Sequence, residues 1–368
     1  MQVYLRPIAL ADSPQSEEGE VVRLAGGLTY ASRFALIVRE GGQVTQRLRT
    51  GVAGMDGAIA ALPEQVREQA QAQWAALRQP HAPLQMGARM VRMDQPQVMG
   101  ILNLTPDSFS DAGQFMDKPE VAHAHAAMML EAGAAIIDVG GESTRPGAPG
   151  VWEGDEIARI VPAVRHLAAM GAAISIDTRR VAVMEEALAA GGHLINDVSA
   201  LRHDARSLEF AAKSGAPVAL MHAPGSGEDL HDDGIYGDVV LDVFDWLRAR
   251  RDAAESAGIE RSRILLDPGI GFGKSLAENL ALMNALPMFH ALGCPLLVGA
   301  SRKRMIGALS NEAPAHRRLG GSVALALKMM EAGVQVIRVH DVPETVQALH
   351  VWRGMRDAAL TDFAQVVD

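Results

Sequence analysis

The sequence Met99-Gly-Ile-Leu-Asn-Leu-Thr-Pro-Asp-Ser-Phe-Ser-Asp111 indicates how the rest of the chain is organised. Its beginning, with Val98 before it, is apolar, which is typical of a strand buried on both faces of a parallel sheet. From Asn103 onward most side chains are polar, and Pro106 stops a strand or a helix from continuing. We therefore predict a buried strand that ends at Asn103 and continues into a polar loop.

The same pattern of an apolar run, a polar residue and a loop occurs seven more times. The eight predicted strands are Val98–Leu102, Ala135–Val139, Ala173–Ile176, Leu194–Ile195, Pro217–Met221, Ile264–Leu266, Pro295–Val298 and Val334–Val339. The helical stretches between them are Val121–Glu131, Trp152–Met170, Val181–Ala190, Val239–Ala257, Leu276–Leu292 and Val323–Ala332. A glycine follows each helix within two residues and can end it without strain. This alternation predicts an α/β protein with a (β/α)8 TIM barrel; a doubly wound open sheet is the alternative, and the count of eight favours the barrel.

Residues 1–80 differ from the rest, and we predict that they form a small N-terminal α/β extension, with the barrel domain at residues 81–368. The predicted elements of the extension are strands at Val3–Arg6, Val21–Ala25 and Phe34–Arg39 and a helix at Pro63–Leu77. Next come a predicted linker at Pro80–Pro83 and a predicted hairpin at Leu84–Gln95, suited to closing the bottom of the barrel. The extension contains no chemical motif, so packing or oligomerisation is favoured over a separate active site.

Composition limits the possible functions. With 368 residues, 48% of them hydrophobic, the chain can bury a large core, and its formal charge of −10 argues against a nucleic-acid partner. The one cysteine, Cys294, cannot form an internal disulfide and precedes an apolar run, so we predict a buried thiol in a cytoplasmic protein. We find no signal peptide and no apolar run of about 18 residues, so we expect no membrane span.

Polar residues follow all eight predicted strands. They include Asn103, Asp138, Asp177, Asn196, His222, Asp267, Lys303, Arg338 and His340. The carboxyl ends of the strands of a TIM barrel meet at one face, where the chemistry of such proteins takes place. A barrel built for stability alone has no need of polar residues at every strand end, so we predict that these side chains converge on one site.

Part of this set is suited to a flat heterocycle. Asp177, Asn196 and Asp267 supply acceptors and an amide, and a carboxylate can accept two parallel N–H bonds from an amidine-like edge. The alternative for Asp177 and for Asp267 is a helix N-cap, and Asp177-Thr178 comes directly before a predicted helix.

Another part of the set is suited to an anion. Arg338 and His340 are two residues apart on a predicted strand, so both face the same side, and with Lys303 they favour phosphate or diphosphate. The alternatives are an Arg338–Asp341 ion pair with a structural His340, and a solvated basic turn at Arg302–Arg304. Asn103 with Asp107 or Asp111 could hold Mg²⁺, although residue type alone indicates this only weakly.

Two other patterns resemble functional motifs without meeting their requirements. Gly269–Ser275 lies between a strand and a helix, but a P-loop requires a glycine where Pro268 stands. His231-Asp232-Asp233, with His222, could form a metal cluster, but on a glycine-rich loop solvated charges are favoured.

Several segments together resemble the dihydropteroate synthase family. They are Met99–Asp111, Asp138–Gly147, Ile176–Thr178, Ile195–Val198, Asp267–Lys274, Ser301–Lys303 and Arg338–Asp341, and they occur in that family's order. The resemblance implies a TIM barrel that joins 4-aminobenzoate to (7,8-dihydropterin-6-yl)methyl diphosphate and releases diphosphate in folate biosynthesis. It also implies a transferase that requires Mg²⁺, forms a homodimer and is inhibited by sulfonamides at the aminobenzoate site. Residues 1–80 have no counterpart in the minimal family, and the segment Ala223–Leu230 is a loose match.

The resemblance also implies a role for individual residues. The pterin ring would be held by Asp177, Asn196, Asp267 and Lys303, with Met221 against its face and Phe272 in the pocket wall. The diphosphate would be held by Arg338, His340 and Asn103, with Asn103 on Mg²⁺ and Thr144 at the ester end. The aminobenzoate site would be bordered by Phe109, Arg145, Pro146 and Lys303. Asp177, Lys303, Arg338 and His340 would be catalytic, without a covalent enzyme intermediate.

Two other functions are compatible with a pterin-binding barrel. A pterin-dependent methyltransferase would need a corrinoid partner and has less use for the cations Lys303, Arg338 and His340. A catalytically silent pterin-binding or scaffold protein would be expected to lack some of the charged site residues of the family. This chain retains all of them.

Overall fold

The computed structural model describes residues 1–11, 19–105, 119–145, 147–148, 150–225, 230–232 and 234–360. Its centre consists of eight parallel strands, β7 (Gln97–Asn103), β8 (Ile136–Gly140), β9 (Ile174–Asp177), β10 (Leu194–Asp197), β11 (Val218–Met221), β12 (Ile264–Asp267), β13 (Leu297–Gly299) and β14 (Val336–Val339). They pair in the order β12-β11-β10-β9-β8-β7-β14-β13, and a parallel bridge between Leu266 and Leu296 joins the two ends. The sheet thus closes into the predicted barrel, and each predicted strand is confirmed.

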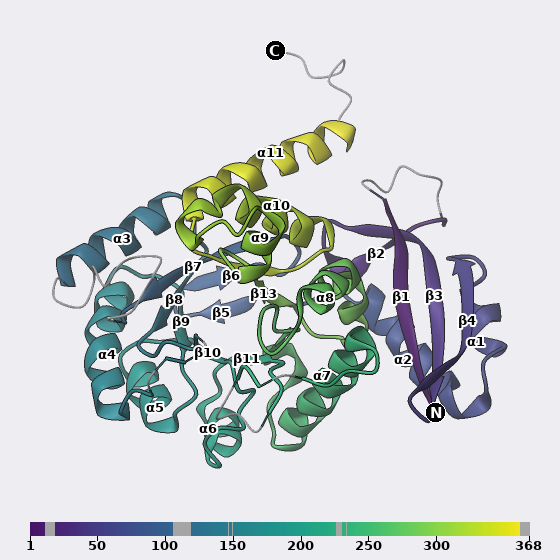
Figure 1. The fold of residues 1–368 in the computed structure, drawn as a ribbon, viewed down its shortest axis with the longest axis horizontal. Coiled ribbons are helices and arrows are strands. Elements are labelled where there is room, and N and C mark those ends of the chain that lie inside the picture. Colours follow the sequence, from purple (N-terminus) through teal and green to yellow (C-terminus); the bar gives the residue numbers. More distant parts are fainter. Residues whose placement is uncertain are drawn as a thin grey trace.

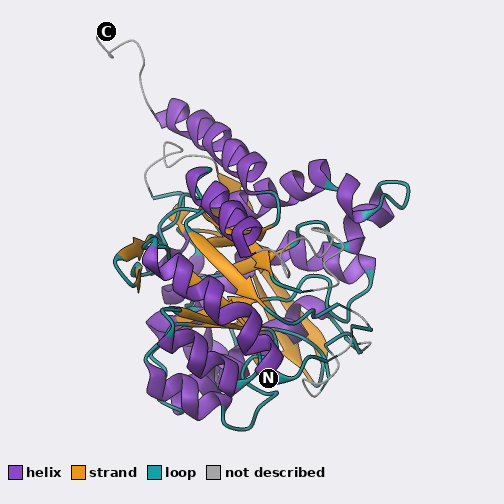
Figure 2. Cartoon of the chain, turned by 90° about the vertical axis from the view of Figure 1, so that its left-hand side faces the viewer, coloured by secondary structure: helices purple, strands orange, loops and turns teal. Residues whose placement is uncertain are grey.

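Helices surround this barrel (Figures 1 and 2). They are α3 (Pro119–Glu131), α4 (Glu153–Ala169), α5 (Val181–Ala189), α6 (Ser207–Ser214), α7 (Val239–Ser256), α8 (Leu276–Phe289), α9 (Arg304–Leu309), α10 (Leu319–Glu331) and α11 (Val342–Leu360). The sequence analysis did not predict α6, α9 or α11. Side-chain capping explains where two of the described helices begin: Asp238 caps α7, and in α8 Ser275 and Glu278 form a capping box. Within the described residues, no helix combines the length and apolarity needed to span a membrane.

A hairpin closes one end of the barrel, as predicted. It consists of β5 (Leu84–Met86) and β6 (Arg89–Val91), which pair antiparallel around Gly87-Ala88. Its buried residues form one apolar cluster with the first residues of the barrel strands: Leu84, Met86, Val91, Met93, Met99, Ile136, Ala173, Leu194, Ala219, Leu265, Leu297 and Val336. This end of the barrel is therefore filled with apolar side chains.

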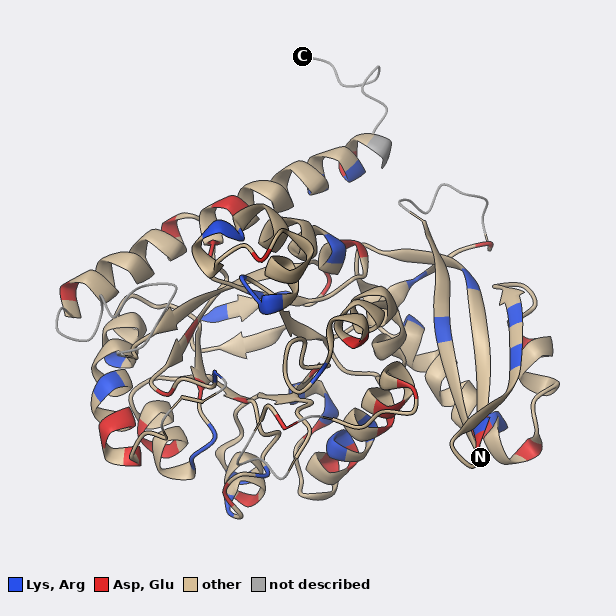
Figure 3. Ribbon diagram, in the orientation of Figure 1, with Lys and Arg blue, Asp and Glu red and all other residues tan. Residues whose placement is uncertain are grey.

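The N-terminal part contains an antiparallel sheet and two helices. The elements are β1 (Gln2–Ala11), β2 (Val22–Arg23), β3 (Tyr30–Glu40), β4 (Gln43–Gly51), α1 (Met55–Ala60) and α2 (Glu64–Arg78). The predicted strand at Val21–Ala25 is largely wrong, because Leu24–Gly26 forms a 3-10 turn. The analysis also missed β4, whose exposed residues include Arg47 and Arg49. Charged residues are a common protection of edge strands, and Figure 3 shows basic residues along this strand.

This N-terminal part packs directly on the barrel helices α7 and α8 (Figure 1). Tyr4 meets Phe244 edge-on at 5.5 Å between ring centroids, and its hydroxyl donates to Asp245 at 2.6 Å. Tyr4, Phe34, Phe244 and Phe289 belong to one continuous apolar cluster. The division into residues 1–80 and 81–368 stays a prediction, but the two parts share a core.

Candidate active site

A cavity of about 1020 Å³ lies at the carboxyl ends of the barrel strands. Its lining includes eleven of the predicted site residues: Asn103, Thr144, Arg145, Asp177, Asn196, Met221, Asp267, Phe272, Lys303, Arg338 and His340. The two others, Phe109 and Pro146, lie outside the described residues. The strands therefore bring together side chains that are more than 200 positions apart in the sequence, such as Asn103 and Arg338. The predicted convergence is confirmed for these residues and for Asp138, which contacts Arg338 and Asn196. It is wrong for His222, whose ring packs against Tyr236 and Trp246 and is not part of the cavity lining. The role of each residue stays a prediction.

Arg338 is held between two carboxylates. Its Nε donates to Asp138 at 2.6 Å and its Nη2 to Asp177 at 2.7 Å. The Asn196 amide donates to both oxygens of Asp138 at 3.3 Å. The alternative pairing of Arg338 with Asp341 is wrong, because Asp341 pairs with Arg302. The four groups form one network across β8, β9, β10 and β14, in which Asp138 and Asn196 are buried and Asp177 and Arg338 are partly exposed to the cavity.

Burial shifts the ionisation of these groups. It raises the pKa of Asp177 to about 7, since Asp138 reinforces the effect and Arg338 only partly opposes it. Burial also raises the pKa of Asp267 and lowers the pKa of Lys303 to about 8. Burial alone would lower the pKa of the Arg338 guanidinium. The negative charges of Asp138 and Asp177 have the larger effect and raise it. The free cavity thus holds one carboxyl, that of Asp177, with a pKa near neutral pH, beside the permanent cation of Arg338.

Asp177 is not the N-cap of α5. The residue at that position is Arg180, whose N–H donates to Thr178 Oγ1 at 3.3 Å. Asp267 accepts a hydrogen bond from Gly269 N at 2.7 Å with one of its carboxylate oxygens. The alternative that Asp177 caps a helix is therefore wrong. The carboxylate of Asp177 lines the cavity.

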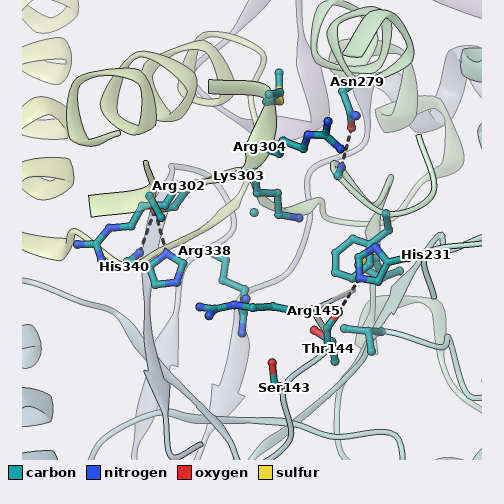
Figure 4. A pocket seen from close by; sticks show the side chains of 18 of the residues that line it. Ser143, Thr144, Arg145, His231, Asn279, Arg302, Lys303, Arg304, Arg338 and His340 are labelled. Atoms are coloured by element: carbon teal, nitrogen blue, oxygen red, sulfur yellow. Dashed lines mark hydrogen bonds between the residues drawn. The ribbon is translucent and has the colours of Figure 1, made fainter. Parts of the chain in front are cut away.

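Phe272 lies between a cation and a histidine. Lys303 Nζ is 4.4 Å from the centre of the Phe272 ring, and the His231 ring stacks on it at 5.0 Å with planes 16° apart. His231 Nε2 also donates to the carbonyl oxygen of Thr144 at 2.6 Å, as Figure 4 shows. The prediction that His231 is a solvated charge is wrong, because this side chain links the loops after β8, β11 and β12.

The cavity is cationic although the whole chain is acidic. Among the described residues its lining includes seven cations and three carboxylates: Arg145, Lys274, Arg302, Lys303, Arg304, Arg318 and Arg338, with Glu142, Asp177 and Asp267. His340 Nδ1 is 3.1 Å from Ser301 Oγ, and burial together with the neighbouring Arg338 and Arg302 keeps the pKa of His340 well below its usual value. A neutral imidazole and several cations together are suited to a multiply charged anion.

Lys274 does not act as a P-loop lysine. Its Nζ donates to the carbonyl oxygens of Gly269 at 2.8 Å and Phe272 at 2.9 Å, and burial lowers its pKa to about 7. This lysine therefore fixes the fold of its own loop.

The described residues contain no group of three or more His, Cys, Asp or Glu side chains placed to hold a metal.

The sequence predictions give Asp138 no role beyond membership of the polar set at the strand ends, and they treat His231 as a solvated charge. Asp138 could have been recognised from strand periodicity, because Ile136 two residues earlier faces the barrel interior. His231 gave no such signal, because its loop has no regular period and its partners Phe272 and Thr144 come from other loops.

Comparisons with known proteins agree with this geometry. The sequence pattern of the family described as "Pterin binding enzyme" matches residues 99–340. The chain therefore belongs to the pterin-binding enzymes. The cavity at the carboxyl ends of its barrel strands is the candidate active site.

Its relatives within that class are dihydropteroate synthases, and the chain belongs to this group. The enzyme of Neisseria meningitidis serogroup B is 46% identical over 275 residues, which are 74% of this chain and 96% of that protein. The enzyme of Escherichia coli K12 is 46% identical over 260 residues, covering 70% of this chain and 91% of that protein.

Solved structures give the same result. Xanthomonas albilineans dihydropteroate synthase with 4-aminobenzoic acid has a TM-score of 0.70 at 45% identity, covering 75% of this chain and 98% of that one. The same enzyme in complex with 7,8-dihydropteroate has a TM-score of 0.67 at 42% identity, covering 74% and 98%.

Proposed function

We propose that this chain condenses (7,8-dihydropterin-6-yl)methyl diphosphate with 4-aminobenzoate, giving 7,8-dihydropteroate and diphosphate. The observation that carries the proposal is the composition of the cavity, where Asp177, Asn196 and Asp267 lie beside Lys303 and His340. Carboxylates and an amide match the donor-rich edge of a pterin, and cations match a leaving diphosphate.

The proposed chemistry is a substitution at the pterin methylene group. As the C–O bond to diphosphate loosens, positive charge develops on the electron-rich ring, and the ionised carboxylates of Asp177 and Asp267 stabilise it. His340 and Lys303 stabilise the departing anion. Arg338 lies 2.7 Å from Asp177 and favours the ionised form of that carboxylate, and it also adds positive charge next to the predicted diphosphate site. The amine of 4-aminobenzoate then attacks the methylene carbon, so no nucleophile of the protein is needed.

We also propose that Mg²⁺ binds at one wall of this cavity. Asn103 lies at the end of β7 and lines the cavity, so its amide oxygen is the proposed ligand. Mg²⁺ prefers oxygen ligands, keeps several waters and often bridges substrate phosphates. Bound there by Asn103 and the substrate, it would neutralise charge on the leaving group. Asp107 and Asp111 lie outside the described residues.

A homodimer is also proposed. Its support is the exposure of apolar side chains on α10 and α11, where Leu319, Val351 and Met355 are 39%, 58% and 64% exposed. We also propose a cytoplasmic location, since the one cysteine, Cys294, is buried and has no partner cysteine in the chain.

The deciding experiment measures diphosphate release by the purified chain with Mg²⁺ and the pterin diphosphate. Release that depends on added 4-aminobenzoate is the expected result. Release at the same rate without the amine would indicate plain hydrolysis. No release, with methyl transfer from a methylated pterin to a corrinoid acceptor, would favour the methyltransferase alternative.

Sensitivity to sulfonamides follows from the same proposal. A related structure is described as the Yersinia pestis enzyme with a sulfonamide drug complex. Ser143, Thr144 and Arg145 of this chain line the cavity, and the Ser-Thr-Arg-Pro-Gly segment carries no insertion. We expect a sulfonamide to inhibit turnover competitively with 4-aminobenzoate. Unchanged turnover at saturating drug and low amine would contradict this prediction.

A further inference from the structure

We propose that the N-terminal part positions an active-site loop of the barrel through Arg39. This inference rests on the proposed function for its kinetic part only. The loop is described at residues 230–232 and 234–238, between β11 and α7, and we call these residues the His231 loop.

The first step is a contact between the two parts of the chain. Arg39, near the end of β3, pairs through Nη1 with Asp242 Oδ1 of α7 at 2.5 Å. The Arg39 side chain is only 12% exposed, so the pair is largely shielded from water and fixed in geometry. The same Nη1 lies 3.9 Å from Asp245. Arg39 thus holds the carboxylate of Asp242 in one orientation.

The second step connects Asp242 with the His231 loop. The other oxygen of Asp242 accepts the backbone N–H groups of Gly237 at 2.8 Å and Asp238 at 3.1 Å. Asp238 in turn caps α7 by accepting from Val240 N and Leu241 N. One carboxylate therefore joins a cation of the N-terminal part to the last two residues of the loop. Rotation of that carboxylate would release both backbone groups.

The third step reaches the cavity. Gly234 N donates to Gly273 O at 3.2 Å, and Tyr236 Oη lies 3.5 Å from the same carbonyl oxygen. Closer to the site, His231 stacks on Phe272 and donates to Thr144 O (Figure 4). Both Thr144 and Phe272 line the part of the cavity proposed for the pterin diphosphate. The loop is therefore fastened to the N-terminal part at one end and to the substrate cavity at the other.

Arg39 is in this sense a positioning residue. Removing it leaves the reacting groups in place but frees the His231 loop, so the effect falls on substrate binding more than on the chemical step. A matched control is Tyr4, whose hydroxyl donates to Asp245 at 2.6 Å across the same interface. This hydroxyl also interacts with the Arg39 side chain, but its hydrogen-bond partners do not include Asp242 or the described loop residues. Tyr4→Phe removes an interface hydrogen bond of comparable length and leaves Asp242 with its partners.

The test uses the full chain and compares wild type, Arg39→Ala, Arg39→Lys and Tyr4→Phe. Hydrogen–deuterium exchange of the amides of residues 234–238 is measured first, because it needs no activity. Arg39→Ala is expected to speed exchange of the Gly237 and Asp238 amides by about tenfold or more, Arg39→Lys by less, and Tyr4→Phe not at all. Thermal melts show whether each variant is folded.

The kinetic arm then measures kcat and KM for the pterin diphosphate. Arg39→Ala is expected to raise KM severalfold with kcat within about twofold of wild type, and adding His231→Ala to it is expected to raise KM no further. Unchanged exchange and KM in Arg39→Ala, or the same changes in Tyr4→Phe, would overturn the proposal. If wild type releases no diphosphate, the proposed function fails, and the exchange data alone decide on the positioning role.

Discussion

At the scale of single residues, the site depends on ionisable groups whose burial is offset by close partners. Lys303 is the clearest case, because its ammonium lies 4.4 Å from the centre of the Phe272 ring and also donates to the carbonyl oxygen of Ile270. Burial lowers the pKa of this lysine to about 8, so at pH 7 most of it is charged. A cation held in this way can act on a developing negative charge without rearranging first.

We predict that Lys303→Ala lowers kcat/KM for the pterin diphosphate by roughly 10²–10³-fold, the size of effect seen when a preorganised electrostatic group is removed. Circular dichroism should show an intact fold, because the lysine is at the cavity wall. Lys213→Ala is the control, since that side chain is 74% exposed on α6. A Lys303→Ala enzyme with wild-type turnover would show that the site assignment is wrong.

Arg338→Gln should destabilise the fold by about 3–5 kcal/mol near pH 8, because it leaves two buried carboxylates without their cation. Burial already raises the pKa of Asp177 to about 7, and losing Arg338 raises it further. The ordinary pKa of an Asp side chain is about 3.9. Between that pH and the higher pKa of Asp177 in the folded chain, the unfolded chain has released a proton that the folded chain retains. The free energy of unfolding therefore falls as pH rises through this window. The loss should therefore be larger at pH 8 than at pH 5. Urea unfolding at both pH values measures it, and an equal loss at both would contradict the argument.

At the scale of elements, the two ends of the barrel have different tasks. The hairpin β5–β6 fills one end with apolar side chains, and the loops after the strands build the cavity at the other. This division separates stability from chemistry, as is usual in barrels of this class. A substitution in the hairpin should therefore affect folding and leave catalysis almost unchanged.

Met86→Ala tests this separation. Met86 is fully buried in the hairpin cluster, and truncating such a side chain costs about 2–5 kcal/mol because a cavity remains. We expect a lower free energy of unfolding by that amount, with kcat/KM within about twofold of wild type. Met90→Ala, on the same hairpin but 65% exposed, should change neither quantity. A large loss of activity in the folded Met86→Ala enzyme would mean that the two ends are coupled.

At the scale of the whole molecule, the N-terminal part and the barrel share one apolar cluster. Trp74 of α2 and Trp352 of α11 belong to it together with Tyr4 and Phe244. The Gln73 side chain also accepts from Leu5 N at 2.8 Å and donates to Val3 O at 2.7 Å, which fastens α2 to β1. Parts joined by a continuous core lose stability together.

We therefore predict a single cooperative unfolding transition for the full chain. Tryptophan fluorescence and far-ultraviolet circular dichroism should give coincident urea curves. The fluorescence reports on Trp74 of the N-terminal part and on Trp152, Trp246 and Trp352 of the barrel part. Two separated transitions would show that residues 1–80 unfold independently, and the shared core would then contribute little.

Much of this architecture could be predicted from sequence, because the barrel strands are short apolar runs bounded by polar loops. Asn103, Asp177, Asp267 and Arg338 were predictable because parallel strands place their ends on one face. The strand β4 was missed because its apolar positions, Val44 and Leu48, are few and only half-buried. The role of His231 was missed because its partners come from two other loops.

The sequence alone determined the number of barrel strands, the polar set at their ends and the family resemblance, since these depend on local periodicity and on residue type. Only the tertiary structure decided that Arg338 pairs with Asp138 and Asp177 and not with Asp341. It also decided that Arg39 reaches Asp242, 203 positions away in the chain. Pairings of this kind depend on distances set by the closed barrel and the attached sheet, and no local pattern in the chain encodes them.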